Sequence, residues 1–152
     1  GFCPLSKLLK KGINVGLGTD GAASNNDLDM MEEMRTTALL AKAVSNNPES
    51  LPAHQALELA TLGGARGLGL ADVTGSLEVG KWADITAVDL SHPACQPVYD
   101  PVSQLVYTAS RQQVSDVWVA GKQLVENREL TQQDQQDCLR RARGWQQKIS
   151  SR

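Results

Sequence analysis

The first part of the chain carries two different spacings of apolar residues. Helix-forming residues 7–11 stop at Gly12, a residue type that commonly follows the end of a helix. After it, Ile13, Val15 and Leu17 alternate with polar or glycine positions, which is typical of a strand. Glycines follow closely behind this run and indicate that the strand ends in a crowded loop. The pattern therefore predicts a helix, a buried strand and then a loop.

A longer run with helical spacing follows the loop. Its apolar positions are Leu28, Met31, Met34, Ala38 and Ala41. This spacing predicts a helix with one buried face, and a side chain within residues 25–27 (Asn25, Asn26 or Asp27) can cap its start. The stretch "SNNPES" ends that helix, and Pro52 is suited to the first turn of the next one. We predict that the second helix ends at Gly63 and Gly64.

From about Gly75 the chain changes to short β segments separated by turn residues. The segments with this pattern are residues 83–90, 103–109 and 116–127. Within the last of them, Gly121 and Lys122 are predicted to form the tip of a hairpin. The second half of the chain is therefore expected to contain a small sheet.

A final helix is predicted after Thr131. The hydroxyl of Thr131 and the carboxylate of Asp134 have the spacing of a capping box. One apolar stripe follows at helical spacing, formed by Leu139, Ala142, Trp145 and Ile149. The basic residues between them are interpreted as a solvated face of the same helix.

The composition is that of an ordinary globular domain. The chain has 152 residues, of which 41% are apolar and 21% charged, and its formal net charge is -2. This near-neutral charge argues against nucleic acid as a partner. No apolar run approaches the roughly 20 residues needed to cross a bilayer, and no signal-peptide pattern opens the chain. We therefore expect no membrane partner and a cytoplasmic location.

The cysteines do not form a recognisable framework. Cys3, Cys95 and Cys138 are odd in number, far apart and in no C-x-x-C pair, which argues against both disulfides and a thiolate zinc site. We expect them to be reduced. The chain opens on "GFCPLSKLLKKG", without an initiating methionine and in what resembles the end of a helix, so we expect it to begin mid-domain.

Gly16, Gly18 and Gly21 spell G-x-G-x-x-G in the loop after the predicted strand. A dinucleotide-binding loop needs a helix that begins within the glycines and a second strand that ends in an acidic residue about 20 positions later. Here the helix is expected to start near Asp27, and helix-forming residues occupy the place of the second strand. Asp20 would also bring negative charge to the phosphates. These mismatches disfavour a dinucleotide site.

Asp20 itself occupies a position typical of catalytic residues. It follows the C-terminal end of the predicted strand, which is where α/β barrels keep their catalytic groups. The alternative is that its carboxylate only hydrogen-bonds its own glycine-rich turn, as aspartate often does. Spacing alone leaves both interpretations open.

The segment "GLGTDGAASNNDLDMMEEMR" resembles the region around the eighth strand of the metal-dependent amidohydrolases. The resemblance is to the branch of 5'-methylthioadenosine and S-adenosylhomocysteine deaminases and their triazine-hydrolase relatives. It continues in order through "LPAHQALELATLGGARGLGL", "GSLEVGKWADITAVDL", "PVYDPVSQLVY" and "VWVAGKQLV". It therefore spans nearly the whole chain, and the ordered set is more specific than any one segment.

This resemblance implies an α/β plus β fold class. Residues 1–72 would form the C-terminal portion of a (β/α)8 amidohydrolase barrel, with its last strand and the helices that follow. Residues 73–130 would form part of a small composite β-sandwich, whose other half comes from the missing N-terminal segment of the same protein. Residues 131–152 would form the C-terminal helix. A barrel of this type needs roughly 250 residues, so the isolated chain is expected to be inactive.

The resemblance also implies a metal-dependent reaction. In the family a divalent metal, commonly zinc, is held by histidines on earlier strands and by an aspartate on the eighth, with which Asp20 aligns. Asp20 is thus expected to bind the metal and to act as a catalytic residue by taking a proton from the metal-bound water. The other ligands would lie in the missing N-terminal segment. His54, in a first helical turn, and His92, in a loop, are interpreted as surface or structural residues.

Ser24 and Asn25 follow Asp20 on the same loop and are candidate substrate-binding residues of the complete protein. Capping of the following helix explains these two side chains as well.

The implied function is hydrolytic deamination of an adenosine-type nucleoside by the full-length parent protein, with release of ammonia. The substrates expected from the resemblance are 5'-methylthioadenosine, S-adenosylhomocysteine or adenosine. One alternative is an amidohydrolase that acts on a triazine, guanine or another aminated heterocycle. Another is a non-catalytic structural module, which the missing ligands favour. Assembly into a homo-oligomer is a family expectation only.

Overall fold

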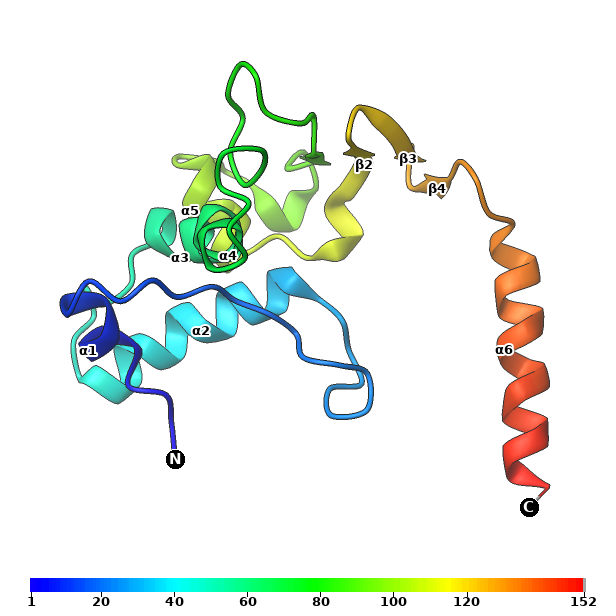
Figure 1. Ribbon diagram of the computed structural model, residues 1–152, viewed down its shortest axis with the longest axis horizontal. Coiled ribbons are helices and arrows are strands. Elements are labelled where there is room, and N and C mark those ends of the chain that lie inside the picture. The colour runs from blue at the N-terminus through cyan, green and yellow to red at the C-terminus, as the bar shows by residue number, and fades with distance from the viewer. Residues whose placement is uncertain (152) are drawn as a thin grey trace.

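The helical part of the chain is built around one long helix, α2 (Met30–Ser45). In the computed structural model, which describes residues 1–151, α3 (Ala53–Ala60) and α5 (Pro101–Tyr107) both pack on α2. The short helix α1 (Leu5–Lys10) lies beside the C-terminal part of α2 (Figure 1). These four helices enclose the hydrophobic core.

Small side chains let the helices approach one another closely. Ala38 of α2, Ala56 of α3 and Val106 of α5 are fully buried. The buried cluster comprises Leu5, Met34, Ala38, Ala41, Leu51, Ala53, Ala56, Leu59 and Val106. Met34, Ala38 and Ala41 lie on the inner face of α2, which confirms these three predicted positions. Met31 is only half-buried, and the prediction is wrong for Leu28, which precedes the helix and is exposed.

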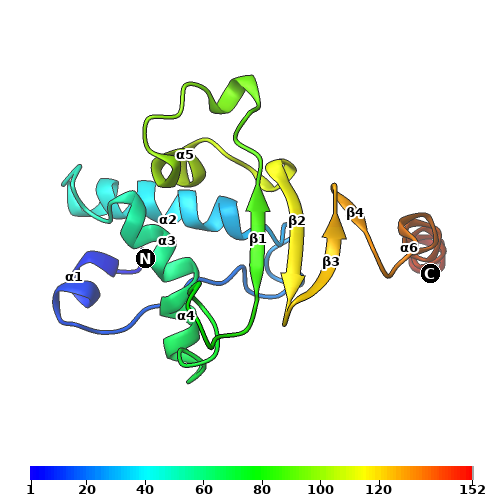
Figure 2. The same cartoon turned by 90° about the horizontal axis from the view of Figure 1, so that it is seen from above.

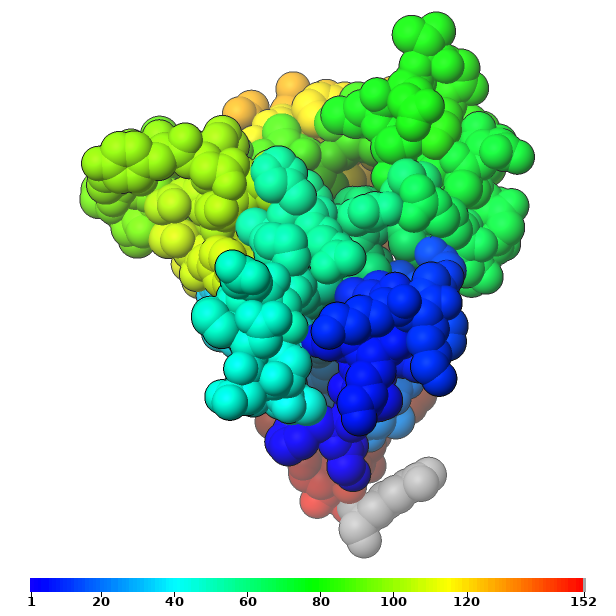
Figure 3. All heavy atoms as spheres, turned by 90° about the vertical axis from the view of Figure 1, so that its left-hand side faces the viewer, coloured from blue at the N-terminus to red at the C-terminus, as the bar shows by residue number. Residues whose placement is uncertain are grey.

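The N-terminal residues cover one side of this core. Leu5 is buried, and the Ser6 hydroxyl donates a hydrogen bond to the Ser50 hydroxyl over 3.3 Å. Lys42 Nζ donates to the carbonyl oxygens of Ser50 and Leu51, at 2.7 and 2.8 Å, and so closes the connection from α2 to α3. Figure 3 shows the N-terminal residues, in blue, against the cyan atoms of this connection.

The start of α2 differs from the prediction. Asp29 is the N-cap, and its Oδ1 accepts hydrogen bonds from the backbone N–H groups of Met31 (2.9 Å) and Glu32 (3.3 Å). The predicted cap within residues 25–27 is therefore wrong. A carboxylate at this position satisfies two free backbone donors and also complements the positive end of the helix dipole.

The predicted strand through Ile13, Val15 and Leu17 is an extended segment without strand partners within residues 1–151. A strand needs a neighbouring strand for its backbone groups, whereas this segment runs along helices. Leu17 N–H donates to the carbonyl oxygen of Leu59 over 3.1 Å, and Asn14 Nδ2 donates to that of Gly63 over 2.9 Å.

Two glycines allow the extended segment to lie directly against α4 (Leu62–Gly67). A Cβ added to Gly16 would lie 2.8 Å from Gly64 Cα, and one added to Gly63 would lie 2.5 Å from the carbonyl oxygen of Val15. Such distances are far inside van der Waals contact. The first glycine of the G-x-G-x-x-G pattern is therefore a packing residue.

The prediction that the second helix ends at Gly63 and Gly64 is wrong. Helix α3 ends at Ala60, and both glycines lie inside α4. Thr61, with φ −127° and ψ −94°, separates the two helices, and its hydroxyl donates to the carbonyl oxygen of Leu57 over 2.7 Å. A non-helical residue ends α3 before the glycines are reached.

The second half of the chain forms one antiparallel sheet in the order β1-β2-β3-β4. Its strands are β1 (Ile85–Val88), β2 (Val114–Val119), β3 (Lys122–Glu126) and β4 (Glu129–Leu130). Figure 2 shows β1 on the side of α2, α3, α4 and α5, and β4 on the opposite side, toward the C-terminal helix. The expected small sheet is therefore present.

The segment 103–109, predicted as β, instead has residues 103–107 in α5 and its last two residues after the end of that helix. Asp100 caps this helix by accepting from the backbone N–H groups of Val102 (3.1 Å) and Ser103 (3.3 Å), and Pro101 occupies its first position. The cap and the proline favour a helix strongly enough to outweigh the β preference of the residues that follow. The 3-10 turns η1 (Pro93–Cys95) and η2 (Arg111–Gln113) flank α5 along the chain.

The β2–β3 hairpin turns through Ala120 and Gly121, with φ values of 48° and 76°. Two positive φ angles are typical of a type I′ turn. The predicted tip at Gly121 and Lys122 is thus displaced by one residue, because Lys122 already belongs to β3. Asp84 supports the turn, since its carboxylate accepts from Ala120 N–H and from the Thr74 hydroxyl, both at 2.7 Å. These two donors, Ala120 first, lower the pKa of Asp84.

Replacing Ala120 by asparagine is expected to stabilise the protein by about 0.5–1 kcal/mol, because asparagine tolerates the left-handed conformation that alanine adopts at a cost. The backbone N–H that Asp84 accepts is kept. Urea unfolding at unchanged m-value measures the difference. A lower free energy of unfolding in Ala120→Asn would contradict the assignment of strain to this turn.

The C-terminal helix α6 (Gln135–Ser150) projects away from the rest of the molecule (Figure 1). Asp134 caps it by accepting from the N–H groups of Gln136 (2.8 Å) and Asp137 (3.3 Å). The predicted cap at Thr131 is wrong, because its hydroxyl donates to the carbonyl oxygen of Gln123 over 2.8 Å. Across residues 1–151, no helix combines the length and the apolarity that crossing a membrane requires.

Candidate functional site

Asp20 lies at the end of the extended segment, where the chain turns toward α2. Its side chain is exposed and its φ is 60°. Oδ1 accepts from Gly21 N–H and Oδ2 accepts from the Ser24 hydroxyl, both at 2.7 Å. These bonds, the one from Ser24 first, lower the pKa of Asp20, so the carboxylate is ionised at neutral pH.

The local hydrogen bonds of Asp20 are those that the turn-residue interpretation requires. They leave acceptor capacity, because an ionised carboxylate offers about four lone-pair sites. A left-handed conformation at a residue other than glycine persists where the surroundings fix it, and such residues cluster at functional sites. The geometry thus suits Asp20 to a ligand or a proton acceptor as well.

The structure brings Ser24 to Asp20 but leaves Asn25 away from the carboxylate. Asn25 Nδ2 donates to the carbonyl oxygen of Thr19 (3.0 Å) and to Glu33 Oε1 (2.9 Å). Its Oδ1 accepts from Asp27 N–H over 3.1 Å. Neither Ser24 nor Asn25 caps α2, so the capping interpretation is wrong for both.

A cluster of carboxylates lies next to this loop. Asp27, Asp29 and Glu32 bring ligand atoms within 4.8 Å of one another, and no other group of three candidate ligands occurs among residues 1–151. Arg111 forms ion pairs with Asp27 and, from Nε to Oδ2 at 3.8 Å, with Asp29. The Asp27 hydrogen bond is the first cause of the raised pKa of Arg111. Because Arg111 already pairs with two of the three carboxylates and Asp29 caps α2, we interpret it as an ion-pair cluster.

Sequence reasoning missed Arg111 because its partner Asp27 lies 84 positions away. No local spacing or motif marks either residue as half of a pair. The signal that was present in the sequence is a basic residue shortly before a strand, which is too common to interpret.

The two histidines lie apart from Asp20. His54 is exposed in the first turn of α3. His92 caps η1, with its Nδ1 accepting from Ala94 N–H over 3.2 Å. Both have the surface or structural roles that the sequence predicted.

A zinc site is tetrahedral and needs several carboxylate, imidazole or thiolate ligands close together. Zinc takes three or four protein ligands, whereas among residues 1–151 Asp20 belongs to no group of three candidate ligands. Cys3 and Cys138 are exposed and Cys95 is buried, and all three are free thiols. The residues described therefore do not form a zinc site by themselves, and a complete site that included Asp20 would need ligands from elsewhere.

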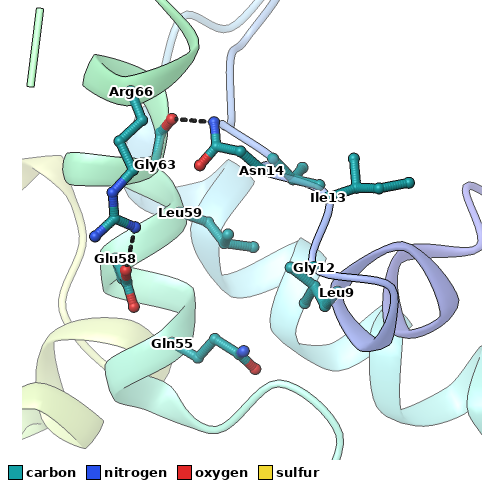
Figure 4. A pocket seen from close by; sticks show the side chains of 10 residues that line it. Leu9, Gly12, Ile13, Asn14, Gln55, Glu58, Leu59, Gly63 and Arg66 are labelled. Carbon is teal, nitrogen blue, oxygen red and sulfur yellow. Dashed lines mark hydrogen bonds and ion pairs between the residues drawn. The ribbon is translucent and has the colours of Figure 1, made fainter.

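An open cavity of about 310 Å³ lies at the start of the extended segment, away from Asp20. Its wall is formed by Leu9, Gly12, Ile13, Asn14, Val15, Gln55, Glu58, Leu59, Gly63 and Arg66. Figure 4 shows the Glu58–Arg66 ion pair, 2.6 Å long, on one side and Asn14 directed toward Gly63 on the other. The charged groups of this wall already pair with each other, and the cavity holds none of the predicted site residues.

Comparison with known proteins gives consistent matches. The model of the amidohydrolase family matches residues 1–124. A 5-methylthioadenosine/S-adenosylhomocysteine deaminase of Teredinibacter turnerae is 47% identical over 152 residues, which is 100% of this chain and 34% of that protein.

Solved structures match over the same extent. An adenosine deaminase from Xanthomonas campestris with bound zinc is 51% identical and superposes with a TM-score of 0.97, over 100% of this chain and 35% of that one. An atrazine chlorohydrolase from Arthrobacter aurescens complexed with zinc is 36% identical, with a TM-score of 0.87 over 95% of this chain and 32% of that one. The chain thus spans about a third of the length of the proteins it matches.

Proposed function

The chain belongs to the amidohydrolase family, and we propose that it is the C-terminal third of a zinc-dependent hydrolase that releases the amino group of an adenosine-type nucleoside as ammonia. The observation that carries the proposal is the match along the whole chain to proteins named for this deamination, at 47% and 51% identity. The substrate class proposed is 5'-methylthioadenosine, S-adenosylhomocysteine or adenosine.

We infer that residues 1–72 complete an amidohydrolase barrel and that residues 73–130 complete a β-sandwich. The extended segment, flanked by α1 and α2, has the order of elements of one barrel unit. It has no strand partner within residues 1–151, as expected for a barrel strand whose neighbours belong to the rest of the protein. In the four-stranded sheet β1 is an edge strand, with which a strand from the rest of the protein would pair.

Asp20 is proposed as the metal-binding and catalytic aspartate. A bound zinc ion would supply a water of lowered pKa. The Asp20 carboxylate, held ionised by Ser24 and Gly21, accepts a proton from the attacking water on a free lone pair and returns it to the departing amine. The remaining metal ligands are proposed to come from the rest of the same protein.

Ser24 is proposed to contact the substrate, because its hydroxyl lies beside the reacting carboxylate and can rotate. The proposed partners are a small-molecule nucleoside, the rest of the same chain and a second copy of the protein in a homo-oligomer. The free, exposed thiols of Cys3 and Cys138 favour a reducing, cytoplasmic location.

A second candidate is hydrolysis of a triazine or another aminated heterocycle. The likeness to the atrazine chlorohydrolase, at 36% identity, favours it. The same Asp20 chemistry would serve both substrates. The choice between them would therefore be set by loops in the rest of the complete protein.

The test is ammonia release by the zinc-loaded full-length parent protein. Ammonia release from adenosine, 5'-methylthioadenosine and S-adenosylhomocysteine is compared with ammonia release from guanine and chloride release from atrazine at equal concentration, and a chelator-treated sample of the parent is the control. Turnover of the nucleosides that the chelator abolishes supports the proposal. A protein that binds zinc and turns over only the triazine or guanine would establish the second candidate instead. Zinc binding without any turnover would favour a non-catalytic module.

A further inference from the structure

The loop of residues 19–29 is tied together by its own hydrogen bonds. The carbonyl oxygen of Gly21 accepts from the N–H groups of Ser24 and Asn25, both at 3.0 Å. Asn25 in turn bridges the carbonyl oxygen of Thr19, next to Asp20, to Asp27 N–H. One side chain therefore links the backbone of Asp27 to the backbone beside Asp20.

The loop is also held by a residue that lies far away in the sequence. Arg111 forms ion pairs with both Asp27 and Asp29. Asp29 is nearly buried, with 9% of its side chain exposed, while 43% of Asp27 and 58% of Arg111 are exposed. One planar guanidinium holding two carboxylates at the loop's end is a more restrictive contact than a single surface ion pair.

Arg111 is itself held in place. It begins η2, which leads directly into β2, and Ser110 and Gln113 form a capping box around this turn. On the other side, Arg35 of α2 donates to the carbonyl oxygens of Val106 (3.3 Å) and Ala109. Arg111 therefore reaches the loop from a segment that is already fixed to α2.

We propose that Arg111 is a positioning residue for Asp20, holding the loop of residues 19–29 against the start of the sheet through Asp27 and Asp29. The role assigned to Asp20 rests on the proposed function, whereas the hold on the loop does not. Arg111 touches neither Asp20 nor any reacting atom, and it acts through the loop.

The test compares Arg111→Ala, Arg111→Lys and Arg66→Ala in the full-length parent protein. Arg66 is the matched control, because it also forms an exposed ion pair, with Glu58 at 2.6 Å, but lies in α4 with its partner in α3, outside both the loop and η2. Hydrogen–deuterium exchange of residues 19–29 and steady-state deamination are measured on the same samples.

In Arg111→Ala, exchange within residues 19–29 is expected to rise about fivefold, because an ion-pair anchor on the loop is lost. The kcat is expected to fall about tenfold with little change in KM, as for a slightly misplaced catalytic group. Arg111→Lys keeps the charge without the planar fork and should restore part of both. Arg66→Ala should resemble the parent.

Unchanged exchange in Arg111→Ala, or an equal rise in Arg66→Ala, would overturn the inference. Raised exchange with an unchanged kcat would overturn the link to Asp20. If the zinc-loaded parent deaminates no nucleoside, the proposed function fails, and the exchange comparison still decides whether Arg111 holds the loop.

Discussion

Asp20→Asn in the full-length protein is expected to lower kcat by about a hundredfold or more, the usual range for loss of a proton-transferring group. Asparagine has the same size and tolerates the positive φ of this position. The amide cannot accept a proton from water as the carboxylate does. The fold should therefore survive while proton transfer is lost.

The measurement is nucleoside deamination with zinc content and circular dichroism determined on the same samples. Asp72→Asn changes an exposed aspartate elsewhere on the chain and serves as the matched control. A correctly folded Asp20→Asn protein with parental activity would show that Asp20 only hydrogen-bonds its turn. Loss of zinc together with activity would identify the metal-binding role, and retained zinc with lost activity the proton-accepting role.

Gly63→Ala is expected to destabilise the protein by about 2–3 kcal/mol, at the upper end of the cost of overpacking. The added Cβ would lie 2.5 Å from the carbonyl oxygen of Val15 and 3.1 Å from that of Glu58. Both are backbone atoms, so no side-chain rotation relieves the clash. The extended segment that leads to Asp20 would have to move away from α4.

Gly64→Ala is the matched control, since the neighbouring glycine lies in the same helix and an added Cβ would meet no atom within 4 Å. Alanine is preferred to glycine in a helix, so this variant should gain about 0.5–1 kcal/mol. Urea denaturation of the two variants separates the steric effect from helix propensity. Equal stabilities would mean that the segment around Val15 does not lie against Gly63 in solution.

Local sequence signals predicted the elements whose pattern is repeated along several turns. The inner face of α2 and the stripe of α6 follow from apolar spacing alone. Helix α5 was missed because the β-branched and aromatic residues of its seven positions suggest a strand, whereas Asp100 and Pro101, just before them, set a helix. Short segments are decided by such caps more than by propensity.

The extended segment shows a different limit. The alternation of Ile13, Val15 and Leu17 is that of a strand, but strand pairing depends on residues far away in the chain or outside it. Asp20 was found through the ordered resemblance, and its two nearest partners lie within four positions of it. Arg111 pairs with Asp27, which lies 84 positions away, and no local motif indicates this contact.

The ion pair between Arg111 and Asp27 also sets a condition for recombining this protein with its relatives. A crossover anywhere between these two positions would join a loop from one parent to a sheet from another. Where the second parent has another residue at position 27 or 111, a chimera that separates Arg111 from Asp27 would leave one of the two charges without its partner. A chimera that exchanges both positions together would keep matched residues at the contact. In libraries of hybrid proteins, residues 27–29 and 111 should therefore be taken from the same parent.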